Sequence, residues 1–179
     1  MKVIGISGKA EHGKTYTCNI LRELYEEQGK KVEIVPLALI LKEYAFDLGW
    51  DGQKDSKGRT LLQDLGKVLK SYHGGDCFAR WAYQKALEKD LDIMLVDDMR
   101  MLDEVEFFKL MAKTSDTSLD DFKLYRVIRK DYENSLTEEQ RNDISETALD
   151  NYDFDLYLQN NGTRDYDNFI IELFDEGII

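Results

Sequence analysis

The sequence predicts an α/β protein with a five-stranded parallel sheet that carries helices on both faces. Short apolar or β-branched runs alternate along the chain with segments whose apolar residues recur at helical spacing. This alternation favours right-handed crossover connections, which make neighbouring strands parallel. At 179 residues the chain can bury one core and is too short for two, so we expect a single domain.

The expected strands are residues 3–7, 32–35, 93–96, 124–128 and 154–158. Residues 93–96 form the most apolar of these runs and are therefore a candidate for the centre of the sheet. The expected helices are residues 14–27, 38–48, 61–69, 78–82, 102–113, a charged stretch over 131–149, and a last helix that begins near Tyr166. Residues 49–59 are expected to form a surface loop, with turns at 73–76 and 114–118.

Composition excludes several classes of function. Lys and Arg number 24 against 36 Asp and Glu, and the resulting charge of −12 argues against binding of a nucleic acid through its phosphates. Cys18 and Cys77 provide neither a disulfide framework nor the four ligands of a structural zinc site. Because no apolar stretch has the length of a signal peptide or a bilayer span, we expect a cytoplasmic protein without a membrane partner.

A phosphate-binding motif lies between the first expected strand and the first helix. Residues 8–15 read GKAEHGKT and fit G-x-x-x-x-G-K-[ST], the P-loop pattern, without a mismatch. Gly8 and Gly13 let backbone amides turn toward a phosphate, which the N-terminus of the next helix also attracts. Lys14 is expected to serve the β- and γ-phosphates in catalysis, and Thr15 to place its hydroxyl on Mg²⁺. The motif therefore predicts ATP and Mg²⁺ as cofactors.

Two neighbours of the motif complete the expected nucleotide-binding loop. His12 lies inside it and Tyr16 directly follows it. We expect both to lie against the bound nucleotide, and we assign His12 no catalytic task.

The lengths between the strands indicate a small P-loop kinase. No N-K-x-D string for guanine is present, and large ATPase machines need a longer chain. A kinase adds two segments to the P-loop core, one that binds the acceptor and a lid. We assign the core to residues 1–36, 87–129 and 151–179, the acceptor-binding insertion to 37–86 and the lid to 130–150.

Charged residues at strand ends are the other catalytic candidates. Asp97 and Asp98 follow the third strand, where one carboxylate can hold Mg²⁺; adjacent residues point to opposite faces, so both cannot do so. Arg129, at the end of the fourth strand, and Arg141, in the lid, are placed to neutralise the transferred phosphoryl group. The alternatives are a solvated strand end for the two acids and surface ion pairs for the arginines.

Further motifs resemble the phage-type deoxynucleoside monophosphate kinases and, more widely, nucleoside monophosphate kinases such as adenylate kinase. Residues 96–100 (VDDMR), followed by Glu104, resemble the strand that leads into D-x-R and a nearby glutamate. Residues 61–66 (LLQDLG) resemble the L-L-Q-x-x-G helix, and residues 38–43 the first acceptor-side helix. Residues 144–146 (ISE) resemble the end of the lid, and residues 160–163 (NNGT) the loop that approaches adenine.

The resemblance implies roles for single residues. It makes Asp98 and Arg100 the functional pair, and so favours Asp98 over Asp97 as the Mg²⁺ ligand. It brings Asn161 and Gly162 close to the adenine of ATP. The residues that it places at the acceptor are Leu37, Lys42, Gln63, Lys70, Trp81, Asp98 and Arg100.

Two departures and one alternative accompany these roles. Lys67 and Lys70 stand where relatives often have threonine and arginine, and Asp143 stands where they often have histidine. A lysine offers a phosphate a point charge in place of a planar fork. Tyr72, Phe78 and Trp81 are candidates for stacking on an acceptor base, although aromatic residues at helical spacing more often belong to the core.

The expected activity is transfer of the γ-phosphoryl group of ATP to a (deoxy)nucleoside monophosphate. Two alternatives stay open: a kinase of another small metabolite, similar to dephospho-coenzyme A kinase or phosphomevalonate kinase, and a nucleotide-binding switch without catalysis. The expected partners are small molecules, and a homodimer stays open.

Overall fold

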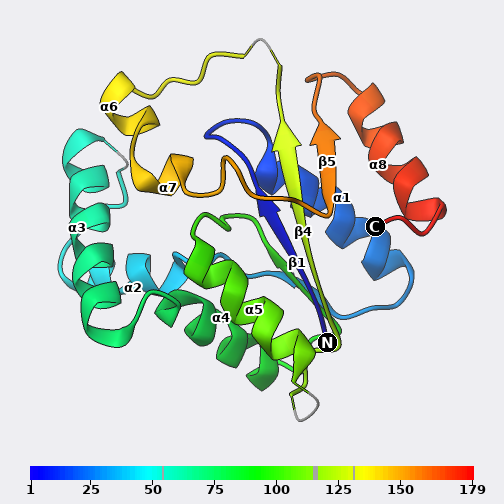
Figure 1. The fold of residues 1–179 in the computed structure, drawn as a ribbon, viewed down its shortest axis with the longest axis horizontal. Coiled ribbons are helices and arrows are strands. Elements are labelled where there is room, and N and C mark those ends of the chain that lie inside the picture. Colours follow the sequence, from blue (N-terminus) through cyan, green and yellow to red (C-terminus); the bar gives the residue numbers. More distant parts are fainter. Residues whose placement is uncertain (54, 115–116, 131) are drawn as a thin grey trace.

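The computed structural model describes residues 1–53, 55–114, 117–130 and 132–179. Its five strands form one parallel sheet in the order β2-β3-β1-β4-β5, which confirms the predicted fold class (Figure 1). The strands are β1 (Lys2–Ser7), β2 (Val32–Ile34), β3 (Ile93–Val96), β4 (Asp121–Ile128) and β5 (Leu156–Gln159). The central position belongs to β1, and β3, all of whose residues are buried, lies beside it.

The parallel arrangement brings the carboxyl ends of four strands to one edge of the sheet. Gly5 of β1 pairs with Val96 at the end of β3, and Ser7 pairs with Arg126 of β4. Ile128, at the end of β4, pairs with Gln159 at the end of β5. Ligands of open parallel sheets bind at this edge, which is also where the P-loop begins.

The two faces of the sheet have separate cores, because successive strand residues point to opposite sides. Val3 packs with α4 (Cys77–Glu88) and α5 (Leu102–Lys113), whereas Ile4 and Ile6 pack with α1 (Lys14–Glu27) and α8 (Asp165–Asp175). Figure 1 shows these two pairs of helices on opposite sides of the sheet.

The insertion between β2 and β3 consists of three helices, α2 (Leu39–Asp47), α3 (Ser56–His73) and α4. The expected loop over 49–59 is too long at its C-terminal end, because α3 already begins at Ser56. The Asp55 side chain accepts a hydrogen bond from the Gly58 amide at 2.8 Å and so caps the helix. Pro36 ends the second strand region, as predicted.

The lid is less helical than the sequence predicts. In place of a helix over 131–149, its described part contains two single turns, α6 (Glu138–Arg141) and α7 (Ile144–Thr147). Thr137 caps the first turn and Asp143 the second, so each polar cap starts a new turn and interrupts a longer helix. Asp131, where the predicted helix begins, lies outside the described residues, as do residues 115–116 of the predicted turn at 114–118.

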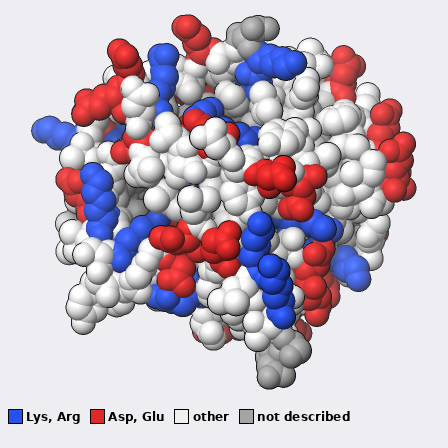
Figure 2. Space-filling view, viewed as in Figure 1, with Lys and Arg blue, Asp and Glu red and all other residues white. Residues whose placement is uncertain are grey.

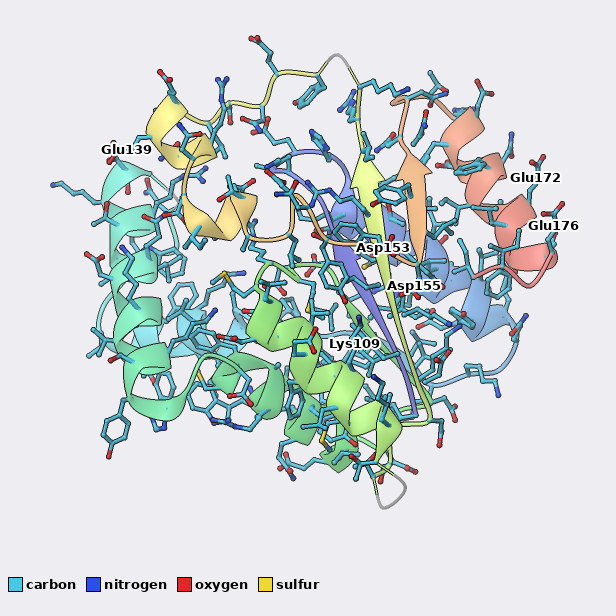
Figure 3. All side chains as sticks on the ribbon, viewed as in Figure 1. Lys109, Glu139, Asp153, Asp155, Glu172 and Glu176 are labelled. Atoms are coloured by element: carbon cyan, nitrogen blue, oxygen red, sulfur yellow. The ribbon has the colours of Figure 1, made fainter. Side chains whose placement is uncertain are left out.

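The surface carries interspersed charges. On the face in Figure 2, acidic and basic side chains alternate, and the visible basic groups form no continuous band. Glu172 and Glu176, labelled in Figure 3, lie on the outer side of α8. Along the described ranges, every helix is too short or too polar to cross a bilayer.

Candidate active site

The P-loop packs against the ends of β4 and β5, and its two glycines are required on steric grounds. Gly8 has φ 145°, and a Cβ there would lie 2.5 Å from the carbonyl oxygen of Val127. Gly13 has φ 100°, and a Cβ there would collide with the side-chain amide of Asn160. Any side chain at either position would therefore displace the loop.

Lys14 lies across the mouth of this loop. Its residue is 9% exposed, and its Nζ donates to the carbonyl oxygen of Lys9 at 2.8 Å. Burial, aided by the charge of Arg100, lowers the pKa of Lys14 to about 8. A desolvated ammonium group inside a loop of inward-turned amides is suited to receive phosphate oxygens.

The two neighbouring aspartates have different partners. Thr15 Oγ1 donates to Asp97 Oδ2 at 2.5 Å, so the carboxylate of Asp97 lies against the end of the P-loop. Asp98 accepts from the amides of Leu37 at 2.7 Å and Ala38 at 3.0 Å, so it holds the start of the insertion. Burial raises the pKa of Asp98 to about 6 despite these amide bonds. The geometry favours Asp97 over Asp98 as a Mg²⁺ ligand, the reverse of the choice made from the sequence.

The residues present fit a Mg²⁺ ion that is bound together with nucleotide. Thr15 and Asp97 offer one hydroxyl and one carboxylate within 2.5 Å of each other. Mg²⁺ commonly takes one or two carboxylates and completes its octahedron with water and substrate phosphates. Within the described part of the chain, no three His, Cys, Asp or Glu side chains gather as a metal cage.

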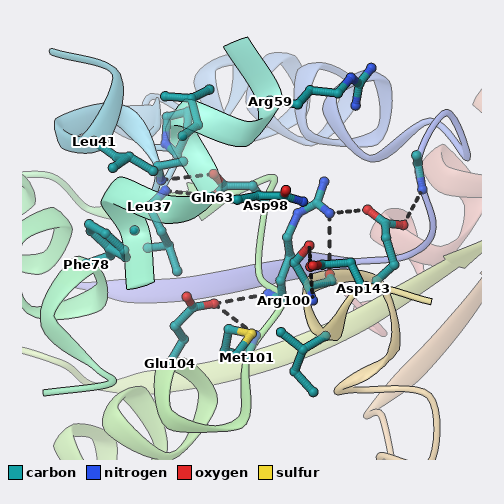
Figure 4. Close-up of a pocket in the computed structure, with 18 of the residues that line it drawn as sticks. Leu37, Leu41, Arg59, Gln63, Phe78, Asp98, Arg100, Met101, Glu104 and Asp143 are labelled. Carbon is teal, nitrogen blue, oxygen red and sulfur yellow. Dashed lines mark hydrogen bonds and ion pairs between the residues drawn. The ribbon is translucent and has the colours of Figure 1, made fainter. Parts of the chain in front are cut away.

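A cavity of about 590 Å³ extends from the P-loop to the insertion and the lid (Figure 4). Most of the residues that the resemblance assigned to the acceptor line this cavity together with P-loop residues. Those along its wall are Lys14, Thr15, Leu37, Lys42, Gln63, Lys70, Asp98 and Arg100. Its volume falls in the range of small-molecule sites, about 300–1,000 Å³.

One buried carboxylate, that of Glu104, contacts the cation of Lys70 and the backbone that carries Arg100. Lys70 Nζ lies 3.0 Å from Oε1 of Glu104, and Oε2 of Glu104 accepts from the amides of Arg100 and Met101 at 3.1 Å and 3.0 Å. The guanidinium group of Arg100 faces the lid, where it pairs with Glu146 and lies 3.4 Å from the carbonyl oxygen of Ser145.

The lid lies directly on the P-loop. Oε2 of Glu146 accepts from the amide of Ala10 at 3.0 Å, and Lys9 Nζ donates to the carbonyl oxygen of Glu146 at 2.6 Å. On its other side, the loop residue Glu11 accepts from the Ser135 amide at 3.0 Å, and the hydrogen bonds from Ser135 lower the pKa of Glu11. Three consecutive loop residues thus contact the lid. Neither the role of Glu146 nor that of Lys9 was identified from the sequence, although the S-E motif marks the first.

The arginines expected to be catalytic do not line the cavity in this conformation. Arg129 lies over the ring of Tyr132, 4.1 Å from its centroid, and beside Gly162. Arg141 Nε donates to the Leu136 carbonyl at 2.9 Å, and Arg126 pairs with Asp150 at 2.7 Å. A catalytic role for Arg129 or Arg141 would therefore require a movement.

The expected base-stacking ring also lies outside the main cavity. Trp81 packs edge-to-face against Phe78 at 5.6 Å and borders a small second hollow. Among the described lining residues, Phe78 is the one aromatic ring that faces the main cavity. The placement of Trp81 favours the alternative of a core residue.

The residues expected beside ATP lie in the P-loop, directly after it, and in the loop that follows β5. His12 Nδ1 accepts from the Arg129 amide at 3.2 Å, which ties the P-loop to the end of β4. Burial lowers the pKa of this imidazole and so favours its neutral form. Tyr16 is half exposed and donates to Asp167 at 2.8 Å. Asn161 accepts from the Thr163 amide at 3.0 Å and forms a turn with Gly162, whose φ is 75°.

Asn160 belongs to the 160–163 motif, but its role in joining two loops was not identified from the sequence. It is 8% exposed. Its Nδ2 donates to the carbonyl oxygen of His12 at 2.9 Å, and its Oδ1 accepts from the Gly162 amide at 2.9 Å. One buried side chain thus joins the P-loop to the loop expected near adenine.

Comparison with known proteins finds similar proteins but does not assign this chain to a family. No protein-family model matches the sequence. A UPF0200 protein of Saccharolobus islandicus is 30% identical over 115 residues, which is 64% of this chain; the match spans about half, 54%, of that protein.

Solved structures of the APS kinase CysC of Mycobacterium tuberculosis resemble the whole chain. A cysteine-to-alanine variant of that enzyme has 17% identity and a TM-score of 0.49, and the alignment covers 97% of this chain and 94% of that one. The same enzyme in complex with AMPPNP and APS has 16% identity and a TM-score of 0.48, with 97% and 95% coverage. Neither is a deoxynucleoside monophosphate kinase, so the acceptor stays a prediction.

Proposed function

We propose that this protein is a kinase that transfers the γ-phosphoryl group of ATP to a nucleoside or deoxynucleoside monophosphate. The observation that carries the proposal is one cavity whose wall holds Lys14 and Thr15 of the P-loop together with Lys70 and Arg100. A cation of the P-loop and two further cations on one cavity wall fit two phosphorylated ligands. Transfer between them requires positioning and charge neutralisation, without a covalent intermediate on the protein.

The residues divide the reaction between donor and acceptor. The loop amides and Lys14 bind the β- and γ-phosphates, and Mg²⁺ held through Thr15 and Asp97 neutralises phosphate charge. Arg100 binds the acceptor phosphate, for which a guanidinium group offers two parallel hydrogen bonds. Because the lid already rests on the P-loop, its closed position keeps water away from the phosphoryl group.

The acceptor base occupies the part of the cavity between α3 and the lid. Gln63 provides an amide that can both donate and accept hydrogen bonds, and Phe78 provides an aromatic wall. Leu37 and Leu41 add an apolar surface. Apolar walls with a few polar groups are typical of sites that hold a planar, partly apolar ligand.

Steady-state ADP formation from ATP and Mg²⁺ tests the proposal. It is measured with no acceptor, with each common nucleoside and deoxynucleoside monophosphate, and with dephospho-coenzyme A and phosphomevalonate. Lys14→Ala is the inactive variant, and Lys30→Ala, an exposed lysine outside the cavity, is the matched control. Turnover that depends on a monophosphate supports the proposal. Turnover with another metabolite alone, or slow turnover indifferent to every acceptor, overturns it in favour of the corresponding alternative.

A further inference from the structure

We infer that Glu104 is a positioning residue that places Lys70 and Arg100 relative to each other at the acceptor-phosphate end of the cavity. The inference rests on the proposed function, since it names how that site would hold the phosphate of a monophosphate. Glu104 itself touches neither reacting atom and acts through the two cations.

The contacts of Glu104 divide between its two oxygens. Its side chain is 5% exposed, although it belongs to the first turn of α5. Oε2 accepts from the amides of Arg100 and Met101, at 3.1 Å and 3.0 Å, which fixes the backbone at the exit from β3. Oε1 lies 3.0 Å from the ammonium group of Lys70, which comes from α3. One carboxylate therefore joins two elements of the cavity wall, and Figure 4 shows its bonds with the backbone of Arg100 and Met101.

Capping of helix α5 would account for the contacts of Oε2 but not for the contact of Oε1 with Lys70. The bonds from the two amides to Oε2 satisfy free donors at the start of a helix, as capping residues do. The bond from Lys70 serves no helix end. A buried carboxylate is costly unless it is paired, and here its partner is a cation that lines the ligand cavity. The Lys70 contact thus calls for a reason beyond helix capping.

Lys70 needs such a partner to stay directed toward the cavity. Its side chain is flexible, and a lysine offers a phosphate a point charge without a fixed plane. The ammonium group lies 5.4 Å from the centroid of the Phe78 ring, so it is held between that ring and Glu104. Because Oε2 accepts from the amide of Arg100, the same carboxylate joins Lys70 to the backbone from which the Arg100 side chain extends.

Glu104→Gln separates the two roles. Glutamine keeps one oxygen, which can accept from both backbone amides, and presents an NH₂ group to Lys70. This group cannot accept from an ammonium ion, so the link to Lys70 is broken while the helix cap remains. Lys70→Met removes the same link from the other side and keeps a similar stem. Glu33→Gln, which removes the carboxylate paired with Lys89 outside the cavity, is the matched control.

The experiment measures acceptor kcat and KM for the two single variants, the double variant and the control, together with binding of a nonhydrolysable ATP analogue. We expect Glu104→Gln to raise the acceptor KM about tenfold, with less effect on kcat and none on analogue affinity, since a charge-assisted contact is lost. The double variant should be no worse than Lys70→Met alone, because both changes break one link. The control should match the wild type.

Losses that multiply in the double variant would show that Glu104 does not act through Lys70 and would overturn the inference. An equal loss of analogue affinity would do the same, since it would reveal general damage. Should Glu104→Gln fail to fold in a thermal unfolding assay, Glu104→Asp keeps the charge but is one methylene too short to hold both partners. An unchanged acceptor KM in that folded variant would overturn the inference. A wild type without acceptor-dependent turnover would instead refute the proposed function.

Discussion

The carboxylate of Glu146 lies between two groups that are expected to bind phosphate. It accepts from the Ala10 amide of the P-loop at 3.0 Å and pairs with the guanidinium group of Arg100. Its side chain is 7% exposed, so both contacts are largely shielded from water. A phosphate chain that enters the loop needs these donors, and it must displace a group of its own charge.

The magnitude follows from the two contacts. A hydrogen bond that involves a charged group contributes about 1.5–3 kcal/mol, and one between neutral groups about 0.5–1.5 kcal/mol. Glu146→Gln turns the contact with the Ala10 amide into a neutral one and leaves Arg100 without its counter-charge. The contacts of residue 146 with Ala10 and Arg100 are then weaker by roughly 1–3 kcal/mol. Because a phosphate ligand must replace these contacts, it should bind about 10- to 100-fold more tightly. The contact from Lys9 to the carbonyl oxygen of residue 146 does not depend on the side chain.

Isothermal titration calorimetry with a nonhydrolysable ATP analogue, and separately with tripolyphosphate, measures this effect. Glu139→Gln is the matched control, since Glu139 is an exposed acid of the same lid, labelled in Figure 3. It should leave both affinities unchanged. Unchanged or weaker binding by Glu146→Gln would refute the reasoning, because it would mean that the carboxylate supports the bound state and does not compete with it.

Three further predictions concern single residues. Lys14→Ala should remain folded and lose about 100-fold or more in turnover, since it removes a charge from the reacting phosphates; wild-type affinity for the ATP analogue should fall as pH rises through about 8, the pKa of Lys14, and the variant should lack that fall. Arg100→Ala should lower acceptor kcat/KM about 10- to 100-fold without lowering analogue affinity, and Arg100→Lys should restore it in part. The folded-state pKa of Asp98 is raised from 3.8 to about 6, so the folded state binds this proton more tightly and stability declines as pH rises between those values. Asp98→Asn cannot ionise, so its melting temperature relative to wild type should rise from pH 4.5 to pH 7; a constant difference would contradict the assignment.

The fold was predictable because its signals are local. The P-loop pattern, the five apolar runs and the helical spacing between them each depend on a few consecutive residues. The errors concern helix boundaries, where a single capping side chain decides at which residue a helix begins or ends. Asp55 starts α3 inside the expected loop, and Thr137 and Asp143 divide the expected lid helix into two turns. Such caps compete with helix continuation, and spacing alone does not show which one prevails.

The candidate site was predictable in membership but not in pairing. Residues that the resemblance assigned to the acceptor, such as Gln63, Lys70 and Arg100, line one cavity, whereas their binding role stays a prediction. It could not show that Glu104 and Glu146 hold two of these cations, because the partners are 34 and 46 residues apart and meet only when the insertion and the lid fold over the sheet. Contacts between distant segments depend on tertiary packing, about which local patterns carry no information.

Asp97 and Asp98 show the same limit at a separation of one residue. The sequence placed one carboxylate on Mg²⁺, and the alternation of side chains required the other to do something else. Only the surroundings decide between them: Thr15 lies beside Asp97, and the amides of Leu37 and Ala38 take both oxygens of Asp98. A carboxylate whose two oxygens already accept hydrogen bonds has less capacity left for a metal ion.

The pairing of charges also bears on how the proposed phosphate ligands would bind to a chain with a net charge of −12. Lys70 is paired with Glu104 and Arg100 with Glu146, so nearby carboxylates offset the charge of both cations. Binding of a polyanion then becomes an exchange of partners, in which a phosphate oxygen replaces a carboxylate. The carboxylate of Glu104 also accepts from two backbone amides, whereas that of Glu146 belongs to a single helical turn of the lid. On the proposed function, we therefore expect Lys70 to keep its partner when phosphate binds, and Arg100 to exchange Glu146 for a phosphate oxygen.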